Sequence, residues 1–283
     1  MTADEIIDQV KDLPVVSETA RKLAMQLNQP DLHRDDLVET VRCDGVLTAK
    51  LLRACNAASF GVREPVASVD QALLLLGDNA IFRMVCAIGF GTALGTLNSY
   101  DAEGNDLWTH SLSVAIGSEY LTDVEGYGNF IPSAAFTAGL LHDIGKTVIN
   151  KMLTAKARSG IWEKICIEQL PPIAAEKAVL GTSHCEVGAS LLRRWRLPDL
   201  VIEAVANHHA PAVKPGVGLS AVVFMADRAV LNASVSPSVE QKVLAEANKT
   251  SAAILGLDIA KVERMVSGIQ SAMDILPQFK AAA

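Results

Sequence analysis

The sequence predicts an all-α protein, and three features of its composition support that fold class. Half of the 283 residues are hydrophobic, but only 5% are aromatic. Leucine and alanine often stand in pairs, which favours helices. Alternating runs of valine, isoleucine and threonine, which favour strands, are scarce. A chain of this length can bury a sizeable core in one large domain or in two closely packed domains.

The first hundred residues are expected to form short helices joined by short turns. Apolar residues over 14–28 recur with helical spacing, and so do those over 37–41 and 46–54. The sequence Ser68-Val69-Asp70-Gln71 has the form of a capping box, S-x-x-Q, directly before another apolar run. Gly77 is the expected end of that helix.

A polar run over 98–106 contains turn residues and almost nothing to bury, so we place a lobe boundary there. Beyond residue 232, amphipathic helices are expected over 237–248 and 258–276, and Asp258 caps the second. The predicted division is an N-terminal helical lobe over 6–97, a helical core over 107–232, and C-terminal helices over 233–283 that pack on the core or mediate association.

The predicted core contains five helices that carry five of the six histidines. A helical bundle of this kind can direct side chains from separate helices into one central pocket. The expected elements are a helix beginning near 107, a helix over 134–153, a helix opening at 182–186, and helices over 200–209 and 219–231.

His142 and Asp143 stand inside an apolar helical run, which is an unfavourable place for a carboxylate. A buried carboxylate needs a cation, a set of hydrogen-bond donors or a shifted pKa. A metal ion would satisfy it. The alternative is that the pair lies on the solvent-exposed edge of an amphipathic helix.

The other candidate ligands also have alternative interpretations. His110 could pack against Trp108 at the surface, His184 could serve at a helix start, and His208-His209 could mark a frayed helix end. Asp227 is flanked by apolar residues on both sides, so it is expected to be buried and to need a partner. Taken together, the candidates favour one metal site: His110, His142, Asp143, His184, His208, His209 and Asp227.

The charge pattern limits the classes of partner. The net charge is −7 and the only basic cluster is at 193–196, so we expect no nucleic-acid polymer. The first residues lack a secretion signal, and no run of about 18 uncharged apolar residues occurs, so we expect no membrane. The five cysteines show no C-x-x-C and no even framework, which indicates reduced thiols. We expect a cytoplasmic protein whose partner is a signalling protein or a phosphoester.

The order of histidines and aspartates resembles the H…HD…D pattern of the HD superfamily of metal-dependent phosphohydrolases. The run from Leu140 to Lys146, LLHDIGK, looks like the central motif of that superfamily. The larger outline, over about residues 6 to 232, resembles the HDOD family, the bacterial signal-output relatives of HD domains. The motifs that carry this resemblance are Leu13-Pro14, Leu52-Arg53-x-x-Asn56-x-x-Ser59-Phe60-Gly61, Ser68-Val69-x-Gln71-Ala72 and Gly139-Leu140-Leu141.

The resemblance implies ligands for one metal, namely His110, His142, Asp143 and Asp227, with Asp143 able to bridge to a second. The second-metal histidines of the HD-GYP branch would fall on His184, His208 and His209. Many HDOD proteins have lost these ligands, whereas this chain has the full set. No Gly-Tyr-Pro follows His209, which argues against cyclic di-GMP as a substrate.

The chemistry of the candidate site follows from its donors. Imidazole and carboxylate suit iron, manganese, zinc or nickel rather than calcium or magnesium, and five histidines with two aspartates exceed the needs of one ion. We therefore expect two divalent transition-metal ions, iron first. Such a pair activates a shared water toward phosphorus. Asp143 and Lys146 are the candidate catalytic residues, because Lys146 shares a helix face with Asp143 and could hold a phosphoryl oxygen; an ordinary exposed lysine is the alternative.

Two classes of function remain open. One is a bacterial signal-transduction module of the HDOD type, with a dinuclear metal site and with protein contact as its output. The other is a metal-dependent phosphohydrolase acting on a nucleotide, a cyclic nucleotide or another phosphoester. The family outline favours the first class and the intact ligand set favours the second. We place the signalling module first because the sequence shows no substrate-recognition motif.

Overall fold

The computed structural model confirms the all-α fold class. Its described parts contain helices and no strand. The described residues are 1–11, 13–14, 16–25, 34–57, 65–94, 106–128, 130–211, 218–234 and 241–276, with the backbone alone for 34–37, 92, 232–234 and 241–247.

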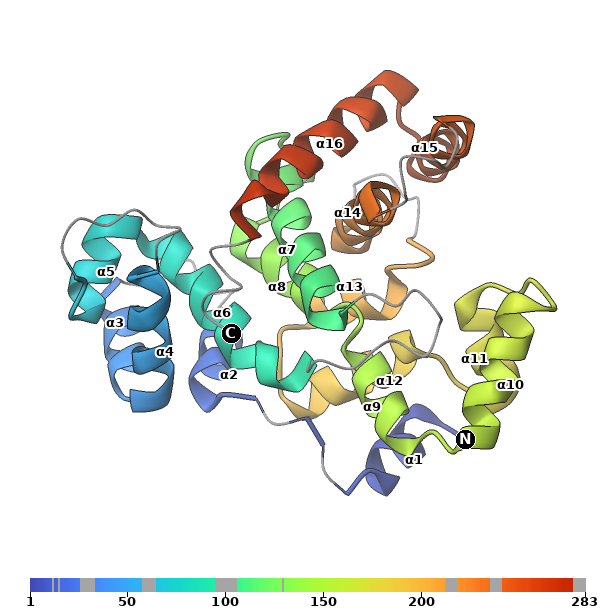
Figure 1. Ribbon diagram of the computed structural model, residues 1–283, viewed down its shortest axis with the longest axis horizontal. Coiled ribbons are helices and arrows are strands. Elements are labelled where there is room, and N and C mark those ends of the chain that lie inside the picture. The colour runs from blue at the N-terminus through green and yellow to red at the C-terminus, as the bar shows by residue number, and fades with distance from the viewer. Residues whose placement is uncertain are drawn as a thin grey trace.

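Six of the described helices lie ahead of residue 95, and side chains cap three of them (Figure 1). They are α1 (Ala3–Gln9), α2 (Glu18–Met25), α3 (Arg34–Arg42), α4 (Gly45–Cys55), α5 (Val69–Leu76) and α6 (Asp78–Leu94). Asp44 caps α4 by accepting from the Leu47 amide, and the Ser17 and Thr19 hydroxyls also donate to its carboxylate, which ties α2 to α4. Helices α2 to α5 all pack on α6, whereas α1 packs on elements far along the chain.

Two sequence-based cap predictions in this region are supported. Ser68 caps α5 by accepting from the Gln71 amide. The Gln71 side chain accepts from the Ala67 amide rather than from Ser68, so the full capping box is not formed. Gly77 ends α5 with a φ of 81°, a conformation that favours glycine.

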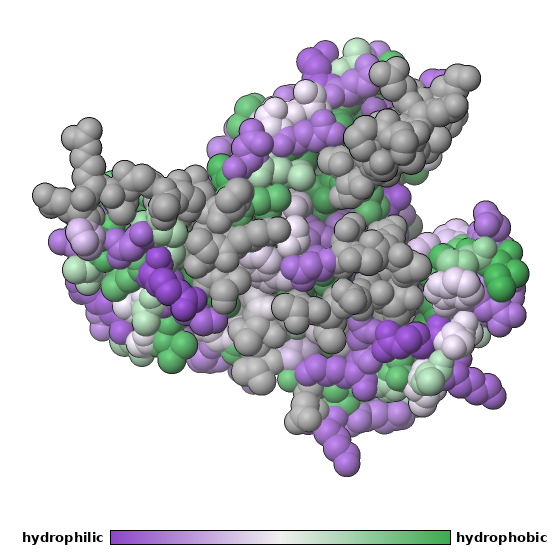
Figure 2. Space-filling model, viewed as in Figure 1, coloured by the Kyte–Doolittle hydropathy of each residue, from purple (hydrophilic) through white to green (hydrophobic). Residues whose placement is uncertain are grey.

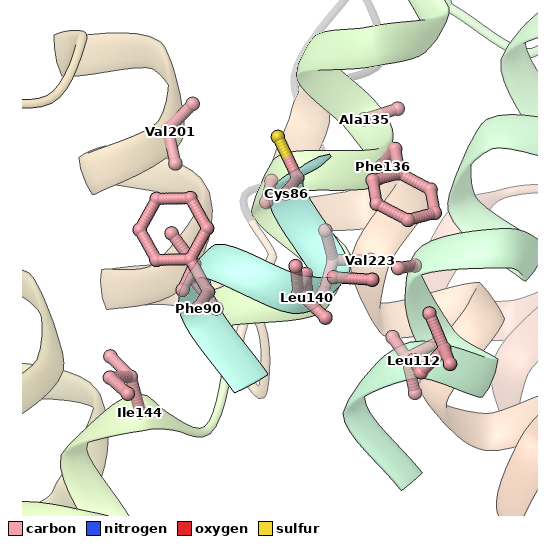
Figure 3. Packing of buried hydrophobic residues seen from close by; sticks show 14 of the residues in the cluster. Cys86, Phe90, Leu112, Ala135, Phe136, Leu140, Ile144, Val201 and Val223 are labelled. Atoms are coloured by element: carbon pink, nitrogen blue, oxygen red, sulfur yellow. The ribbon is translucent and has the colours of Figure 1, made fainter. Parts of the chain in front are cut away.

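The central region contains eight described helices that follow α6. They are α7 (Leu107–Asp123), α8 (Pro132–Leu141), α9 (Ile144–Met152), α10 (Ala155–Cys166), α11 (Pro172–Leu180), α12 (His184–Arg194), α13 (Asp199–Asn207) and α14 (Leu219–Ser234). Helix α6 packs on α7, α8 and α9, so it belongs to the cores of both regions. Figure 3 shows Phe90 of α6 in one cluster with buried side chains of the central region, namely Leu112, Phe136, Leu140, Ile144, Val201 and Val223.

The C-terminal helices pack directly on the central region. They are α15 (Gln241–Leu255) and α16 (Ile259–Ala272), followed by the short 3-10 helix η3 (Met273–Ile275). Asp258 caps α16, as predicted. Helix α16 contacts α7 and α14, and at Gly117 an added Cβ would lie only 2.8 Å from Ile269 Cγ2, so a glycine is needed for this close approach.

Three predicted element bounds are wrong. The single helix expected over 134–153 is two helices, because α8 ends at Leu141 and α9 begins at Ile144. The helix expected to run through His209 ends at Asn207, and the C-terminal helix expected over 237–248 continues to Leu255. Most of the predicted lobe boundary at 98–106, and residues 58–64 with part of the family motif, lie outside the described residues. The three-part division therefore stays a prediction.

In the coloured parts of the face shown in Figure 2, hydrophilic residues are interspersed with hydrophobic ones, over the N-terminal helices as well as the α10–α11 pair. None of the described helices combines the length and the apolar character that crossing a bilayer requires.

Candidate metal centre

The junction between α8 and α9 positions the His-Asp pair. Asp143 has φ −101° and ψ 10°, outside the helical region, and its side chain caps no helix. The break turns the carboxylate into the interior, where Asp143 is 1% exposed. The unbroken helical periodicity of the sequence gave no sign of this turn.

Two glycines beside this junction allow other helices to approach it closely. At Gly139 an added Cβ would lie 2.8 Å from Ala115 Cα of α7, the helix that carries His110. At Gly145 it would lie 1.9 Å from the carbonyl oxygen of His184, the first residue of α12. The glycines of the motif therefore bring the neighbouring histidine-bearing helices against the His-Asp pair.

One group of candidate ligands faces the Oδ2 atom of Asp143. His142 Nε2 lies 3.3 Å from Oδ2, and His110 Nε2 lies 3.7 Å from it. His110 Nε2 is also 3.3 Å from His142 Nε2 and 3.3 Å from Asp227 Oδ1 of α14. The donor atoms of His110, His142 and Asp227 thus converge on one small space beside Oδ2.

A second group faces the other oxygen of Asp143. His184 Nε2 lies 3.3 Å from Oδ1, and His208 Nε2 lies 3.7 Å from it. His209 Nε2 is 3.2 Å from His184 Nε2. The two oxygens of one carboxylate therefore face two different sets of imidazoles.

Two hydrogen bonds fix which nitrogen of each ring faces the centre. His142 Nδ1 lies 2.8 Å from the Gly139 carbonyl, and His208 Nδ1 lies 2.8 Å from the Val205 carbonyl. A carbonyl only accepts, so each Nδ1 carries the proton and each Nε2 presents a lone pair. These two Nε2 atoms are suited to bind a cation.

The buried atoms that lack partners support a bound cation. Asp143 Oδ1 and His208 Nε2 are both buried without a hydrogen-bond partner, although they lie 3.7 Å apart. Both are acceptors, so they cannot bond to each other. Leaving two such atoms buried and unsatisfied is costly. A metal ion between them would satisfy both, and the residues present fit such an ion.

The pKa directions differ among the clustered groups: Cys185 and Glu176 raise the pKa of His184, and Asp227 raises that of His110, despite burial. The pKa values of three other groups shift in the direction that suits metal binding. Burial opposes ionisation of Asp143, but its close neighbours His142 and Lys146 hold its pKa well below the usual range. Burial and the neighbouring His209 lower the pKa of His208 well below its ordinary value. Burial and His184 lower the pKa of His209 to about 4. Both rings are therefore neutral at pH 7 and available as ligands.

Two basic side chains lie beside the aspartates. Lys146 Nζ is 2.9 Å from Asp143 Oδ2, and Lys146 is only 8% exposed, so it is not the ordinary surface lysine that was the alternative. Arg228 Nη2 is 2.9 Å from Asp227 Oδ2, and the Arg228 side chain is 36% exposed. Sequence reasoning did not single out Arg228.

The structure also reveals two neighbours that sequence reasoning missed. Glu176 of α11 is fully buried, and its carboxylate lies 2.8 Å from His184 Nδ1. The Cys185 thiol lies 3.8 Å from His208 Nδ1, and its sulfur groups with the donor atoms of His184, His208 and His209. Glu176 lies eight residues before His184, with a turn between them, so no helical spacing could have linked the two.

The structure brings all of the predicted ligands together. His208 is fully buried, which does not fit a frayed helix end. His184 is fully buried at the start of α12, where its ring bonds to Glu176, and His110 and His209 are partly buried. His142, Asp143 and Asp227 are buried. Their assignment as metal ligands, and that of Lys146 and Asp143 as catalytic residues, stays a prediction.

Comparisons with known proteins identify proteins that are similar to this chain in structure or in sequence. An HDOD domain protein of unknown function from Geobacter sulfurreducens has a similar structure, with a TM-score of 0.72, 26% identity, and coverage of 96% of each chain. An uncharacterized protein of Treponema pallidum is 25% identical over 207 residues, which are 73% of this chain and 39% of the relative. Ribonuclease Y of Lactobacillus gasseri is 25% identical over 208 residues, 73% of this chain and 31% of that enzyme.

The chain spans less than half of the length of these curated relatives. The model of the HDOD domain family matches residues 13–211, from the loop before α2 to just beyond His209. This match covers most of the chain and includes most of the helices around the metal centre. The protein belongs to the HDOD domain family.

Proposed function

We propose that the protein holds two divalent transition-metal ions and acts as a metal-dependent phosphohydrolase. The observation that carries this proposal is the position of Asp143. Its Oδ2 faces His110 and His142, and its Oδ1 faces His184 and His208. A carboxylate placed in this way can bridge two ions.

The donor set indicates the class of metal. Imidazole and carboxylate donors suit iron, manganese, zinc or nickel, and iron remains our first expectation. When bound, two such ions supply Lewis acidity at a phosphoryl group and lower the pKa of the attacking water.

The basic side chains of the centre are suited to hold the substrate. Lys146 and His110 have side chains 10% and 11% exposed, whereas those of His184 and His208 are fully buried. A phosphoester therefore reaches the centre from the side of Lys146 and His110. The Lys146 ammonium and the guanidinium of Arg228 can each bind a phosphoryl oxygen there.

The charge of the protein favours a small phosphoester as the substrate. Ribonuclease Y, one of the relatives, is by its name an enzyme that acts on RNA. This chain has a net charge of −7, and a polyanion would be repelled by it. A nucleotide or a cyclic nucleotide fits the centre better than an RNA polymer does.

Family membership favours a signalling role for the same chain, with protein contact as its output. One feature of the N-terminal helices supports this second function: Leu74 and Leu75 of α5 are 76% and 53% exposed, far from the metal centre in sequence. Adjacent exposed leucines are suited to contact a protein partner. We place this activity in the cytoplasm, which the five free cysteines support.

Metal analysis of single-ligand variants tests the proposed function. The wild type should contain about two ions per chain, because the donors form two groups. His142→Ala and His208→Ala each remove a ligand from one group, so each should lose about one ion. The metal-loaded wild type should hydrolyse a phosphoester from a panel of nucleotides, cyclic nucleotides and a short RNA, and a chelator should abolish the turnover.

The outcomes separate the two functions. Folded wild-type protein that takes up no metal would refute the metal centre. Two bound ions without turnover of any substrate would refute the hydrolase and leave the signalling role. Preferred hydrolysis of the RNA would contradict the inference drawn from the net charge.

A further inference from the structure

Glu176 makes an unusual set of contacts with one histidine of the centre. Both of its carboxylate oxygens lie 2.8 Å from His184 Nδ1. Its Oε2 also accepts a hydrogen bond of 2.7 Å from the main-chain amide of His184. Glu176 and His184 are both fully buried. A carboxylate at this depth is stable only with such compensation.

The Nδ1 bonds of two other histidine rings in the centre are of a different kind. His142 and His208 donate from Nδ1 to neutral carbonyl groups, of Gly139 and Val205. Those carbonyls lie three residues before each histidine in the same stretch of chain, so the contacts are local. The partner of His184 carries a full negative charge and comes from a different helix.

The charge of Glu176 acts on the atom that faces the centre. Because Nδ1 donates to the carboxylate, Nε2 of His184 is directed at Asp143 Oδ1, 3.3 Å away. An anionic acceptor at Nδ1 increases the electron density of the ring and makes Nε2 a stronger ligand. A neutral carbonyl has a smaller effect.

We propose that Glu176 is a positioning residue that strengthens one of the two metal positions, the one formed by His184, His208 and His209. This inference rests on the proposed function only in requiring that the centre binds metal. It makes the two positions unequal, since the group of His110, His142 and Asp227 contains no imidazole with a buried glutamate as its partner among the described residues.

The substitution Glu176→Gln tests this inference. Glutamine keeps the volume and can still accept a hydrogen bond, but it removes the charge. We expect the affinity of one Mn²⁺ ion to fall by about 10- to 100-fold, as is typical when a partner of a ligating histidine is changed. The affinity of the other ion should stay at the wild-type value. Calorimetric titration of metal-free protein with Mn²⁺ resolves the two binding events.

Ser183→Ala is the matched control for a purely structural role. Ser183 caps the same helix: its hydroxyl accepts from the Glu186 amide and donates to the Glu186 carboxylate. Its loss should lower the melting temperature without changing either Mn²⁺ affinity.

Two double variants show which of the two metal positions is weakened by Glu176→Gln. In Glu176→Gln/His142→Ala protein, the ion that remains should bind weakly. In Glu176→Gln/His208→Ala protein, it should bind as tightly as in His208→Ala alone.

Two Mn²⁺ ions bound by Glu176→Gln with wild-type affinities would overturn the inference and leave the proposed function intact. An equal loss of affinity at both positions would also overturn it, because this would show a general effect on folding. If the wild type failed to bind Mn²⁺, both the proposed metal centre and this inference would be refuted.

Discussion

Two buried carboxylates in this protein have opposite electrostatic surroundings. Asp143 lies between histidines of several helices, with the Lys146 ammonium 2.9 Å from its Oδ2. Glu119 lies at the contact of α6 and α7, where its Oε2 pairs with Arg83 Nη1 at 3.1 Å. Burial opposes ionisation of both. The pKa of Asp143 is nevertheless held well below its usual range, whereas burial raises the pKa of Glu119 to about 7.

The difference lies in the number of nearby cations rather than in the depth of burial. Asp143 is 1% exposed and Glu119 is 7% exposed. Several positive or protonatable groups surround Asp143, but Glu119 has the guanidinium of Arg83, and the nearby Asp123 adds negative charge. A buried carboxylate therefore stays charged where several basic side chains lie close to it, as they do around Asp143.

The largest effect is expected from Asp143→Ala, which removes the carboxylate shared by both groups of ligands. It should lose most of both metal ions and all hydrolysis of phosphoesters. It should also lower stability by about 3–5 kcal/mol in the presence of a chelator, because Lys146 is left buried without this partner. Metal analysis and denaturant unfolding measure the two effects.

Asp227→Ala is the control for this prediction. Asp227 faces His110 and Arg228 and belongs to one group of ligands. Its removal should cost about one ion, while the position formed by His184, His208 and His209 stays filled. If the Asp143→Ala variant bound both ions as the wild type does, Asp143 would not bridge the two groups of ligands.

A smaller effect is expected from removing the charge of Lys146. In the metal-loaded hydrolase, Lys146→Ala should keep both ions but lower turnover by about 10²-fold, the usual effect of one charge-stabilising group at an organised site. Lys146→Met keeps more of the buried side-chain volume, so it separates the loss of charge from the creation of a cavity. Steady-state kinetics with metal analysis of both variants checks this. Unchanged turnover in both would exclude Lys146 from catalysis.

The sequence was sufficient to predict the fold class and the seven histidine and aspartate residues that the structure brings together. Apolar periodicity gave the helices, and caps such as Asp258 marked where they begin. The candidate ligands were found because the histidines, Asp143 and Asp227 lie in predicted helices, and a helical bundle can direct side chains from several helices into one pocket. Each of these signals is local, so a single sequence contains it.

The parts that were missed depend on how helices approach each other. The break at Asp143 is not visible in the apolar pattern of 134–153, because α8 and α9 are each apolar up to the junction. Glu176 meets His184 only because Gly181, with φ 85°, reverses the chain between α11 and α12. The structure shows a capping box of Ser183 and Glu186 after this turn, and the angle between the two helices follows from their packing rather than from a local pattern.

The smallest effect is expected at the other carboxylate, in Glu119→Gln. The folded pKa of Glu119, about 7, is above its ordinary value of 4.5, so the folded state binds this proton more tightly than the unfolded state does. The resulting stabilisation is fully present below about pH 4.5 and is lost as the pH rises through 7. Between pH 5 and pH 8, the wild type should therefore lose up to about 3 kcal/mol of stability that Glu119→Gln retains.

Urea unfolding of both proteins at pH 5 and pH 8, with a chelator present, measures this difference. The chelator removes the pH dependence of metal binding, and the histidines of the centre contribute equally to both proteins. Glu163→Gln, at an exposed position of α10, controls for the loss of one negative charge and should follow the wild type. If Glu119→Gln is instead less stable than the wild type at pH 8, the ion pair with Arg83 outweighs burial, and Glu119 would resemble Asp143 after all.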